Sequence, residues 1–321
     1  MKKISYKIIN KKKELTQLRN KIKLISLETK PFNKKLYLEK FWDWQYKKLP
    51  SKISYIFGAY DRDKIIGYIH VPIFNYFLNN KAILSACIQE VAIDKDYRKL
   101  KIFSHFLEYS IKYLKKKKIQ FIYSFPNKRS IKAFLNLKFK KVLKYKLSLV
   151  PIFFLKKSNQ KIFISTKFRK EFNHCNTFFL KKHSSGILKN EKYFKWRFES
   201  SLKTNYIYIY TKTKKKVTAF IVVRRLKFFG LNFIIIMDLG YKKKNYLIEL
   251  VRSLRMHKLF KSVYFLILSG NFKGFSYIIK KINGISIPDF INVRKLFYVI
   301  STNNNFQKKN LSCNFSDWDV L

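Results

Sequence analysis

Several features that mark common classes of protein are scarce or missing in this chain of 321 residues. Its three cysteines, Cys87, Cys175 and Cys313, are odd in number and far apart, which excludes a disulfide framework and metal-ligand spacing. Its five histidines form no pair at ligand spacing, so we expect no metal. No apolar run reaches the roughly 18 residues that a membrane-spanning helix needs, and the first residues lack a signal-peptide core. We therefore predict a cytoplasmic protein without a membrane span.

Acidic residues, arginine and glycine are also scarce. Asp and Glu number 18 against 70 Lys and Arg, for a net charge of +52, but only 11 of the basic residues are arginine. Proteins that read bases or clamp phosphates favour arginine, whose planar guanidinium makes bidentate contacts. The lysines are spread along the chain, and there are only 8 glycines. Many lysines and few glycines are typical of a coding sequence that has drifted toward adenine and thymine. We expect nucleic acid to bind only nonspecifically, at low salt.

An internal repeat divides the chain. With 47% hydrophobic residues, its length suits two domains of about 150 residues with a core each. Residues 38–46 align with 190–198, and 64–71 with 216–223, at one constant offset that also matches Trp44 with Trp196. Both copies predict an aromatic helix followed by two strands and a polar turn. We interpret this as duplication, with coincidence in a biased composition as the alternative, and predict domains at 1–155 and 156–321.

The first half reads as an α/β domain. Periodicity predicts helices at 102–115 and 127–137 and a shorter helix at 41–48. Strands are predicted at 55–60, 65–71, 82–93 (with a bulge or break), 119–125 and 139–149. The fold class is therefore α/β, with a mixed and mostly antiparallel sheet flanked by helices in each of two tandem domains.

Two segments of the first half carry a family resemblance. Residues 91–103, VAIDKDYRKLKIF, resemble the signature of GNAT acetyltransferases, where a strand ends in an apolar triplet and continues into Arg-x-x-Gly-x-Gly/Ala. Residues 125–134, FPNKRSIKAF, resemble the strand end, asparagine and helix that line the pantetheine slot of that family. The resemblance covers about residues 38–150 and extends to 190–285 only through the internal repeat. Within the family, the chain resembles the GNAT proteins of surface-polysaccharide and amino-sugar pathways.

The resemblance implies acetyl-CoA as the acyl donor, bound partly by backbone N–H groups at a helix N-terminus. It assigns this binding to Val91, Ala92, Ile93, Arg98, Lys99, Lys101, Ile102, Phe103, Asn127 and Ser130.

The chain departs from the family pattern at the phosphate loop. Lys101 and Phe103 replace both family glycines, and no glycine occurs between Gly67 and Gly186. Glycine lets the backbone approach a phosphate closely and adopt positive φ. Lys101 keeps its N–H group and adds an ammonium within reach of a phosphate. The alternative is an ordinary basic loop that precedes a helix.

Acyl transfer to an amine needs a base, a group that holds the oxyanion and an acid for the leaving thiolate. Glu90, beside the apolar triplet, is the candidate catalytic base; the alternative is an edge carboxylate that pairs with a lysine. Backbone N–H groups near Val91 or Ala92 are candidates for the oxyanion. In the family the acid is often a tyrosine at the position of Phe134, which has no proton to donate. Water, or a tyrosine elsewhere such as Tyr97 or Tyr123, would have to supply the proton, and the sequence does not choose between them.

The second half keeps the hairpin and the strand leading to Asn271 but lacks the phosphate loop. After Met237 the chain reads DLGYKKKN, with no arginine at the required spacing. We predict a degenerate copy that shapes the acceptor cleft. The function that the resemblance implies is acetyl transfer to an amine of a small acceptor, such as an amino sugar nucleotide in surface-glycan synthesis. The alternatives are a Fem-type aminoacyl transferase that uses charged tRNA and a non-catalytic GNAT-derived binding protein.

Overall fold

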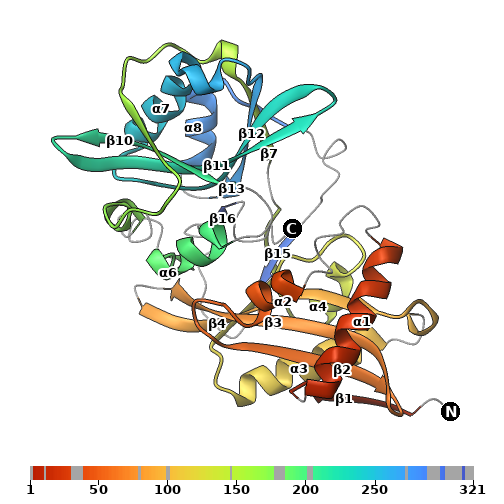
Figure 1. The fold of residues 1–321 in the computed structure, drawn as a ribbon. Coiled ribbons are helices and arrows are strands. Elements are labelled where there is room, and N and C mark those ends of the chain that lie inside the picture. Colours follow the sequence, from red (N-terminus) through yellow and green to blue (C-terminus); the bar gives the residue numbers. More distant parts are fainter. Residues whose placement is uncertain are drawn as a thin grey trace. The chain divides into compact units, whose positions relative to one another are not determined.

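The chain folds into two compact units (Figure 1). The computed structural model describes residues 3–10, 12–29, 39–78, 81–98, 102–144, 147–176, 185–200, 205–271, 274–287, 297–300 and 313–314. Unit 1 comprises Met1–Asn75, Ile83–Lys144 and Leu296–Phe306. Unit 2 comprises Tyr76–Ala82, Tyr145–Lys295 and Gln307–Leu321.

Unit 1 is built on a mixed sheet with the strand order β1-β2-β3-β4-β5-β15-β6. Its strands are β1 (Ile4–Ile8), β2 (Ser54–Asp61), β3 (Lys64–Leu78), β4 (Lys81–Ile93), β5 (Phe121–Ser124), β6 (Lys140–Lys144) and β15 (Phe297–Ile300). Strands β4 and β5 run parallel, whereas β1, β2 and β3 are antiparallel neighbours. The hairpin between β2 and β3 turns at Arg62, whose φ is 52°. The sequence therefore predicted this hairpin, although β3 is longer than expected.

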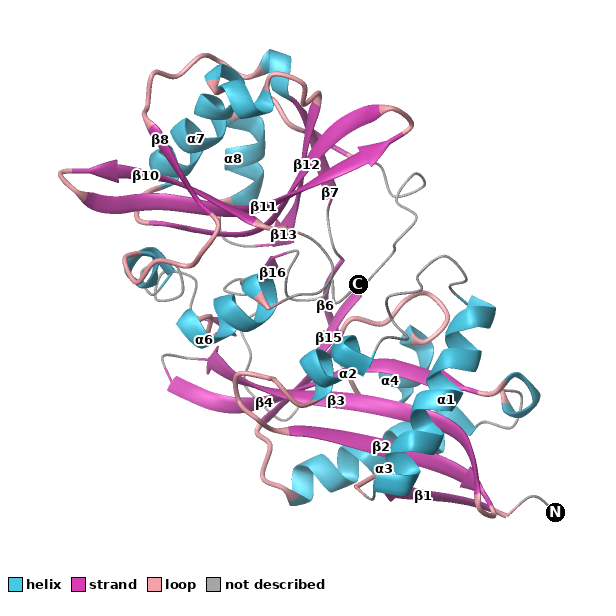
Figure 2. Cartoon of the chain, viewed as in Figure 1, coloured by secondary structure: helices cyan, strands magenta, loops and turns pink. Residues whose placement is uncertain are grey.

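Helices cover both faces of the unit 1 sheet (Figure 2). They are α1 (Lys12–Thr29), α2 (Glu39–Tyr46), α3 (Ile102–Lys116) and α4 (Ile131–Asn136). The side chains of α3 that recur every three or four residues, including Ile102, Phe106 and Leu114, are buried against the sheet with those of α4. Leu18 of α1 and Tyr46 of α2 pack on the opposite face. The predicted amphipathic helix at 102–115 is confirmed.

Unit 2 has a second mixed sheet, with the strand order β14-β7-β13-β12-β11-β10-β8. Its strands are β7 (Leu147–Pro151), β8 (Ile162–Ser165), β10 (Ile207–Thr213), β11 (Lys216–Phe228), β12 (Leu231–Tyr241), β13 (Phe265–Asn271), β14 (Ile285–Ser286) and β16 (Cys313–Asn314). Strand β9 (Ser185–Ile187) belongs to the first sheet. Its helices are α6 (Glu191–Phe194), which continues as a π-helical turn (Lys195–Glu199), α7 (Lys244–Ser253) and α8 (Phe275–Lys281). Residues of α7 and α8 form the core of unit 2 with the sheet. Strand β9 pairs with the end of β3, and β16 with β13.

The predicted closing strand at 139–149 is wrong as a single strand. Strand β6 ends at Lys144 and pairs with β15, whereas β7 starts at Leu147 and pairs with β13 of the other sheet. Val150 and Leu155 consequently belong to the core of unit 2, so this division differs from the predicted boundary at residue 155. Alternating apolar residues fit either sheet, so the sequence pattern does not reveal where the chain crosses between them.

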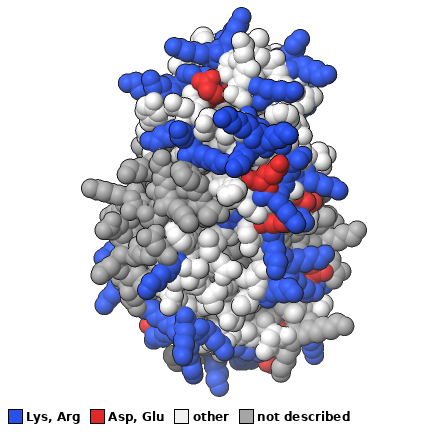
Figure 3. All heavy atoms as spheres, turned by 90° about the vertical axis from the view of Figure 1, so that its left-hand side faces the viewer, with Lys and Arg blue, Asp and Glu red and all other residues white. Residues whose placement is uncertain are grey.

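The basic residues are spread over the surface, as the sequence indicates. On the face shown in Figure 3, Lys and Arg side chains occur throughout and Asp and Glu are few. None of the helices in the described part of the chain is long and apolar enough to span a bilayer.

Candidate active site

The strand predicted at 82–93 with a bulge or break departs from regular geometry at Glu90, which we interpret as a bulge. This residue has a φ of 51°, in the left-handed region that non-glycine residues seldom adopt. Successive side chains of a regular strand point to opposite faces, but a bulge places two neighbours on one face. Gln89 accordingly contacts His70, and Glu90 contacts Tyr46, whose ring lies 3.7 Å from that of His70 between centroids. The bulge therefore turns the Glu90 carboxylate toward α2.

Two side chains of α2 hold this carboxylate. Gln45 Nε2 donates a hydrogen bond of 2.7 Å to Glu90 Oε1, and the Tyr46 hydroxyl donates to Oε2. Both donors are buried, with 2% and 7% of their surface exposed. Burial, and secondly the charge of Glu90, raises the pKa of Tyr46 well above its usual value, so the hydroxyl keeps its proton. Glu90 is half-buried, so its carboxylate is fixed in orientation at the edge of the core.

The two parallel strands separate immediately before Glu90. Pairing of β4 with β5 runs from Ser85 with Phe121 to Ile88 with Ser124, and the Ser124 hydroxyl donates to the Ile88 carbonyl at 2.7 Å. Within the described residues, no further pair follows. Parallel strands that diverge expose main-chain groups along the gap, which suits an extended chain such as pantetheine.

Val91, Ala92 and Ile93 follow directly on this part of β4. Val91 and Ala92 are half-buried, and Ile93 is buried. On the other side of β4, a Cβ atom at Gly67 of β3 would lie 2.8 Å from the Ala92 carbonyl oxygen. Glycine at this position therefore lets β3 pack closely behind the candidate site.

Arg98 lies after a short 3-10 helix, Lys95–Tyr97, and its Nε donates to the carbonyl of Ile93 at 2.9 Å. This bond ties the arginine to the end of β4. Helix α3 begins at Ile102, which is buried, and Phe103 packs against Phe134. Its first turn contains no acidic residue, so the partial positive charge of the helix N-terminus is not neutralised there. Lys99 and Lys101 lie outside the described residues.

The predicted residues of the second segment have a local structural role. Asn127 Oδ1 accepts hydrogen bonds from the backbone N–H groups of Arg129 and Ser130, at 2.9 and 3.1 Å. It also accepts from the Ser130 hydroxyl at 3.2 Å. Asn127 therefore fixes the turn that leads from β5 into α4. Phe134 of α4 is buried against Phe139 and belongs to the core.

Sequence reasoning missed the residues that surround Glu90. Gln45, Tyr46 and Gln89 were not singled out, and His70 was considered only as a metal ligand. Burial lowers the pKa of His70 well below its usual value, so the imidazole is neutral, and its Nε2 has no hydrogen-bond partner among the described residues. The sequence signal that pointed to this region was the aromatic segment around Trp44. It predicts a helix that packs on the sheet, but it does not predict that the helix contacts Glu90. No cluster of metal-binding side chains occurs among the residues that the structure describes.

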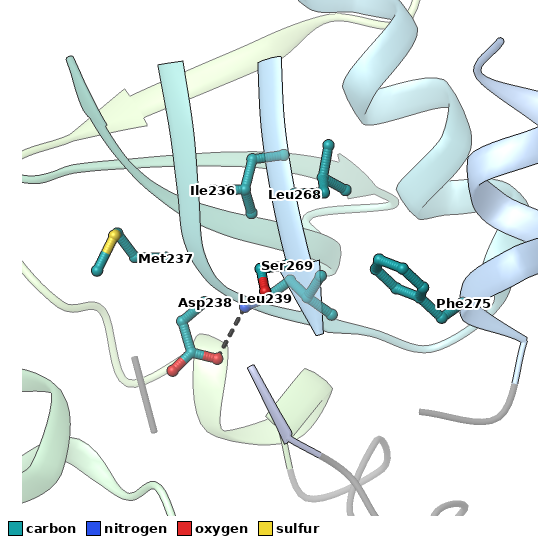
Figure 4. A pocket seen from close by; sticks show the side chains of 7 residues that line it. All are labelled: Ile236, Met237, Asp238, Leu239, Leu268, Ser269 and Phe275. Carbon is teal, nitrogen blue, oxygen red and sulfur yellow. Dashed lines mark hydrogen bonds between the residues drawn. The ribbon is translucent and has the colours of Figure 1, made fainter. Parts of the chain in front are cut away.

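Unit 2 has a carboxylate at the equivalent place in its sheet. Pairing of β12 with β13 also comprises four pairs and ends at Ile236 with Leu268. Asp238 follows two residues later, as Glu90 follows Ile88, and the register between β11 and β12 shifts beside it. Asp238 lines a small pocket with Ser269 and Phe275 (Figure 4). Its carboxylate accepts from the Leu239 N–H at 2.8 Å and pairs with Lys189 at 2.9 Å, so it is already neutralised.

Comparison with known proteins agrees with this architecture. The model of the family described as acetyltransferase (GNAT) domain matches residues 22–133. A GCN5-related N-acetyltransferase from Anabaena variabilis is similar in structure, with a TM-score of 0.72, 10% identity and coverage of 93% of this chain and 72% of that chain. A probable N-acyltransferase from Enterococcus faecalis has a TM-score of 0.70, 11% identity and coverage of 94% and 72%.

An N-myristoyltransferase from Saccharomyces cerevisiae with bound myristoyl-CoA has a TM-score of 0.60, 12% identity and coverage of 97% and 88%. No curated protein matches the sequence. Residues 22–133 therefore match a GNAT acetyltransferase domain, and the chain has an α/β fold with mixed sheets similar to the GNAT fold.

Proposed function

We propose that the chain is an acyltransferase of the GNAT type that moves an acetyl group from acetyl-CoA to an amine of a small acceptor. The observation that carries the proposal is the position of Glu90. It lies on a bulge just past the last pair between two parallel strands, in a segment that matches the GNAT domain. A carboxylate held by two buried donors at the edge of a gap between strands is suited to accept a proton.

The donor is assigned to the gap between β4 and β5. Val91, Ala92 and Ile93 contribute main-chain groups along it, and Arg98 is held at the end of β4. The N-terminus of α3, at Ile102 and Phe103, supplies a partial positive charge suited to the diphosphate. Lys99 and Lys101 are proposed to add cationic contacts. Asn127 and Ser130 shape the opposite side through the turn before α4.

In the proposed reaction, Glu90 accepts a proton from the acceptor amine, directly or through a water. The amine nitrogen then bonds to the acyl carbon of the thioester, and the carbon–sulfur bond breaks. A backbone N–H near Val91 or Ala92 stabilises the oxyanion. Phe134 is in the core, so water protonates the leaving thiolate in this scheme. Gln45 and Tyr46 keep the carboxylate oriented throughout.

We take an amino sugar nucleotide of surface-glycan synthesis as the first acceptor class to test, with the protein acting in the cytoplasm. The resemblance of residues 91–103 and 125–134 to GNAT proteins of those pathways motivates this choice. Unit 2 is proposed to be a degenerate copy, because its equivalent carboxylate is neutralised by Lys189.

Calorimetry with acetyl-CoA, followed by chromatographic detection of free CoA with amine acceptors, tests the proposal. Changing Glu90 to Gln should lower kcat by about 100-fold or more with little effect on acetyl-CoA binding. The matched control is Glu108→Gln, which removes an exposed carboxylate from α3 and should leave kcat unchanged. Absence of acetyl-CoA binding at high micromolar concentration would rule out the enzyme and favour a non-catalytic binding protein. Equal activity of both variants would exclude Glu90 as the base.

A further inference from the structure

One end of the unit 2 sheet carries a cluster of exposed apolar side chains. The strand pairs show that three segments meet there, because Phe228 pairs with Leu231, Phe233 with Phe265, and Phe265 with Pro151. The bond from Arg225 to the carbonyl of Leu259 adds a fourth segment. We call this surface the apolar end of unit 2. It is formed by Phe153, Phe154, Phe228, Phe229, Leu231 and Leu259.

The β11–β12 hairpin projects beyond the rest of this end (Figure 1). Strand β10 pairs with β11 only as far as Val223, and β13 pairs with β12 only from Phe233. Among the described residues, the hairpin tip is therefore a two-stranded ribbon with no strand paired beside Phe228 or Phe229. Phe228 and Phe229 are 57% and 88% exposed.

Of the two turn residues of this hairpin, Gly230 suits the turn and Phe229 does not. Phe229 and Gly230 both have positive φ, 47° and 75°, as a two-residue hairpin turn of the mirror-image type requires. Asn, Asp or Gly adopts this conformation readily, whereas a bulky aromatic residue does so only with strain. The ring of Phe229 contacts that of its neighbour Phe228, at 4.4 Å between centroids. Neither packing nor turn chemistry explains an aromatic residue at this position.

The charge around the apolar end has one sign. Basic side chains flank it on each of its segments, namely Lys156, Lys157, Arg225, Lys227, Lys258 and Lys261. No Asp or Glu occurs in residues 145–170, 200–237 or 250–288, which include all of these segments. Exposed aromatic rings surrounded by basic side chains suit the surface of an anionic bilayer. The rings can enter the acyl region while the cations contact the headgroups.

We propose that the apolar end of unit 2 docks onto a membrane that contains anionic lipid, with Phe228 and Phe229 inserted below the headgroups. A bilayer fits better than a protein partner, because a stable protein interface buries about 800 Å² on each side and needs a broad complementary surface. A narrow ribbon tip offers little such area, whereas a bilayer accommodates a single projection. This proposal does not depend on the acyltransferase function.

The test uses the full chain and vesicles of phosphatidylcholine, with or without phosphatidylglycerol, at physiological ionic strength. The variant Phe228→Ser/Phe229→Asn keeps the net charge and gives the turn an Asn-Gly pair, so its folding should be preserved. Its partition onto anionic vesicles should fall by about tenfold or more, because the remaining attraction is electrostatic alone. The matched control is Leu84→Ser/Leu135→Ser, which removes side chains that are 40% and 43% exposed in unit 1. This control should bind like the wild type.

Insertion is read separately with Phe229→Trp, whose emission should be quenched by lipids brominated on their acyl chains. Equal partition of the wild type and the Phe228→Ser/Phe229→Asn variant would overturn the proposal, because binding would then come from net charge alone. Failure of the wild type to bind anionic vesicles would overturn it as well. A smaller oligomer for the variant, with unchanged vesicle binding, would reassign the surface to a contact between copies of the chain.

Discussion

The buried ion pair between Lys189 and Asp238 gives the most direct test of the energetics of unit 2. Their side chains are only 6% and 1% exposed, and the charged atoms lie 2.9 Å apart. Changing Lys189 to Met keeps most of the side-chain volume but removes the ammonium that pairs with the buried Asp238 carboxylate, while the bond from the Leu239 N–H stays. Removing one partner of a buried pair costs about 3–5 kcal/mol, since the remaining charge is desolvated without compensation. At roughly 2–4 °C for each kcal/mol, the thermal midpoint should fall by roughly 6–20 °C.

Urea unfolding followed by circular dichroism measures the loss, and a double variant tests its cause. Lys189→Met/Asp238→Asn removes both charges while retaining the acceptor for Leu239, and should recover more than half of the lost stability. The matched control is Lys195→Met, which breaks an exposed pair with Glu191 and should cause no measurable change. A loss below about 1 kcal/mol for Lys189→Met would refute the reasoning, because ordinary substitutions cost that much. A double variant as unstable as the single one would do the same.

Three further predictions concern unit 1 and the buried thiol. Changing Tyr46 to Phe removes the donor to Glu90 Oε2; kcat should fall about tenfold in steady-state kinetics, and the free energy of unfolding should fall by about 1–3 kcal/mol. Changing Phe134 to Tyr restores the family residue but places a hydroxyl in the core. The free energy of unfolding should fall by about 1–3 kcal/mol in urea titrations, and kcat should not rise. Burial raises the pKa of Cys175 from 9.0 to about 12. Between about pH 9 and pH 12 the Cys175 thiol therefore ionises in the unfolded protein but not in the folded protein, so the free energy of unfolding falls as the pH rises. In urea titrations, Cys175→Ala should show a smaller fall over this range.

The sequence predicted those elements whose signal is local. Helix α3 is recognised by its apolar spacing, and the long strand at 82–93 was predicted with allowance for a bulge or break, which the positive φ of Glu90 matches. Strand β15 was not predicted, because its pairing with β5 and β6 depends on residues far apart in the chain. For the same reason the division of residues 139–149 between two sheets has no sequence signal.

The candidate site was predictable to the extent that a motif covers it. Glu90 could be named because it precedes the apolar triplet, and its place past the last pair of β4 and β5 is a feature of the fold. Its partners Gln45 and Tyr46 come from an aromatic helix whose residues suggest only packing. The tertiary contact that brings them to Glu90 is long-range, so neither spacing nor composition indicates it. Asn127 was singled out as a site residue, and the structure shows that it also fixes a turn.

The comparison of Glu90 with Asp238 supports the proposed division of roles between the units. Each carboxylate lies two residues beyond the last of four parallel pairs, so the fold offers both units the same position for a base. Asp238 is held by an ammonium and a backbone N–H, so its charge is already paired within unit 2. Glu90 is held by an amide and a phenol, which orient it without neutralising its charge. The same strand geometry therefore yields a candidate base in unit 1 and a structural ion pair in unit 2, and the difference arises from the residue that faces the carboxylate.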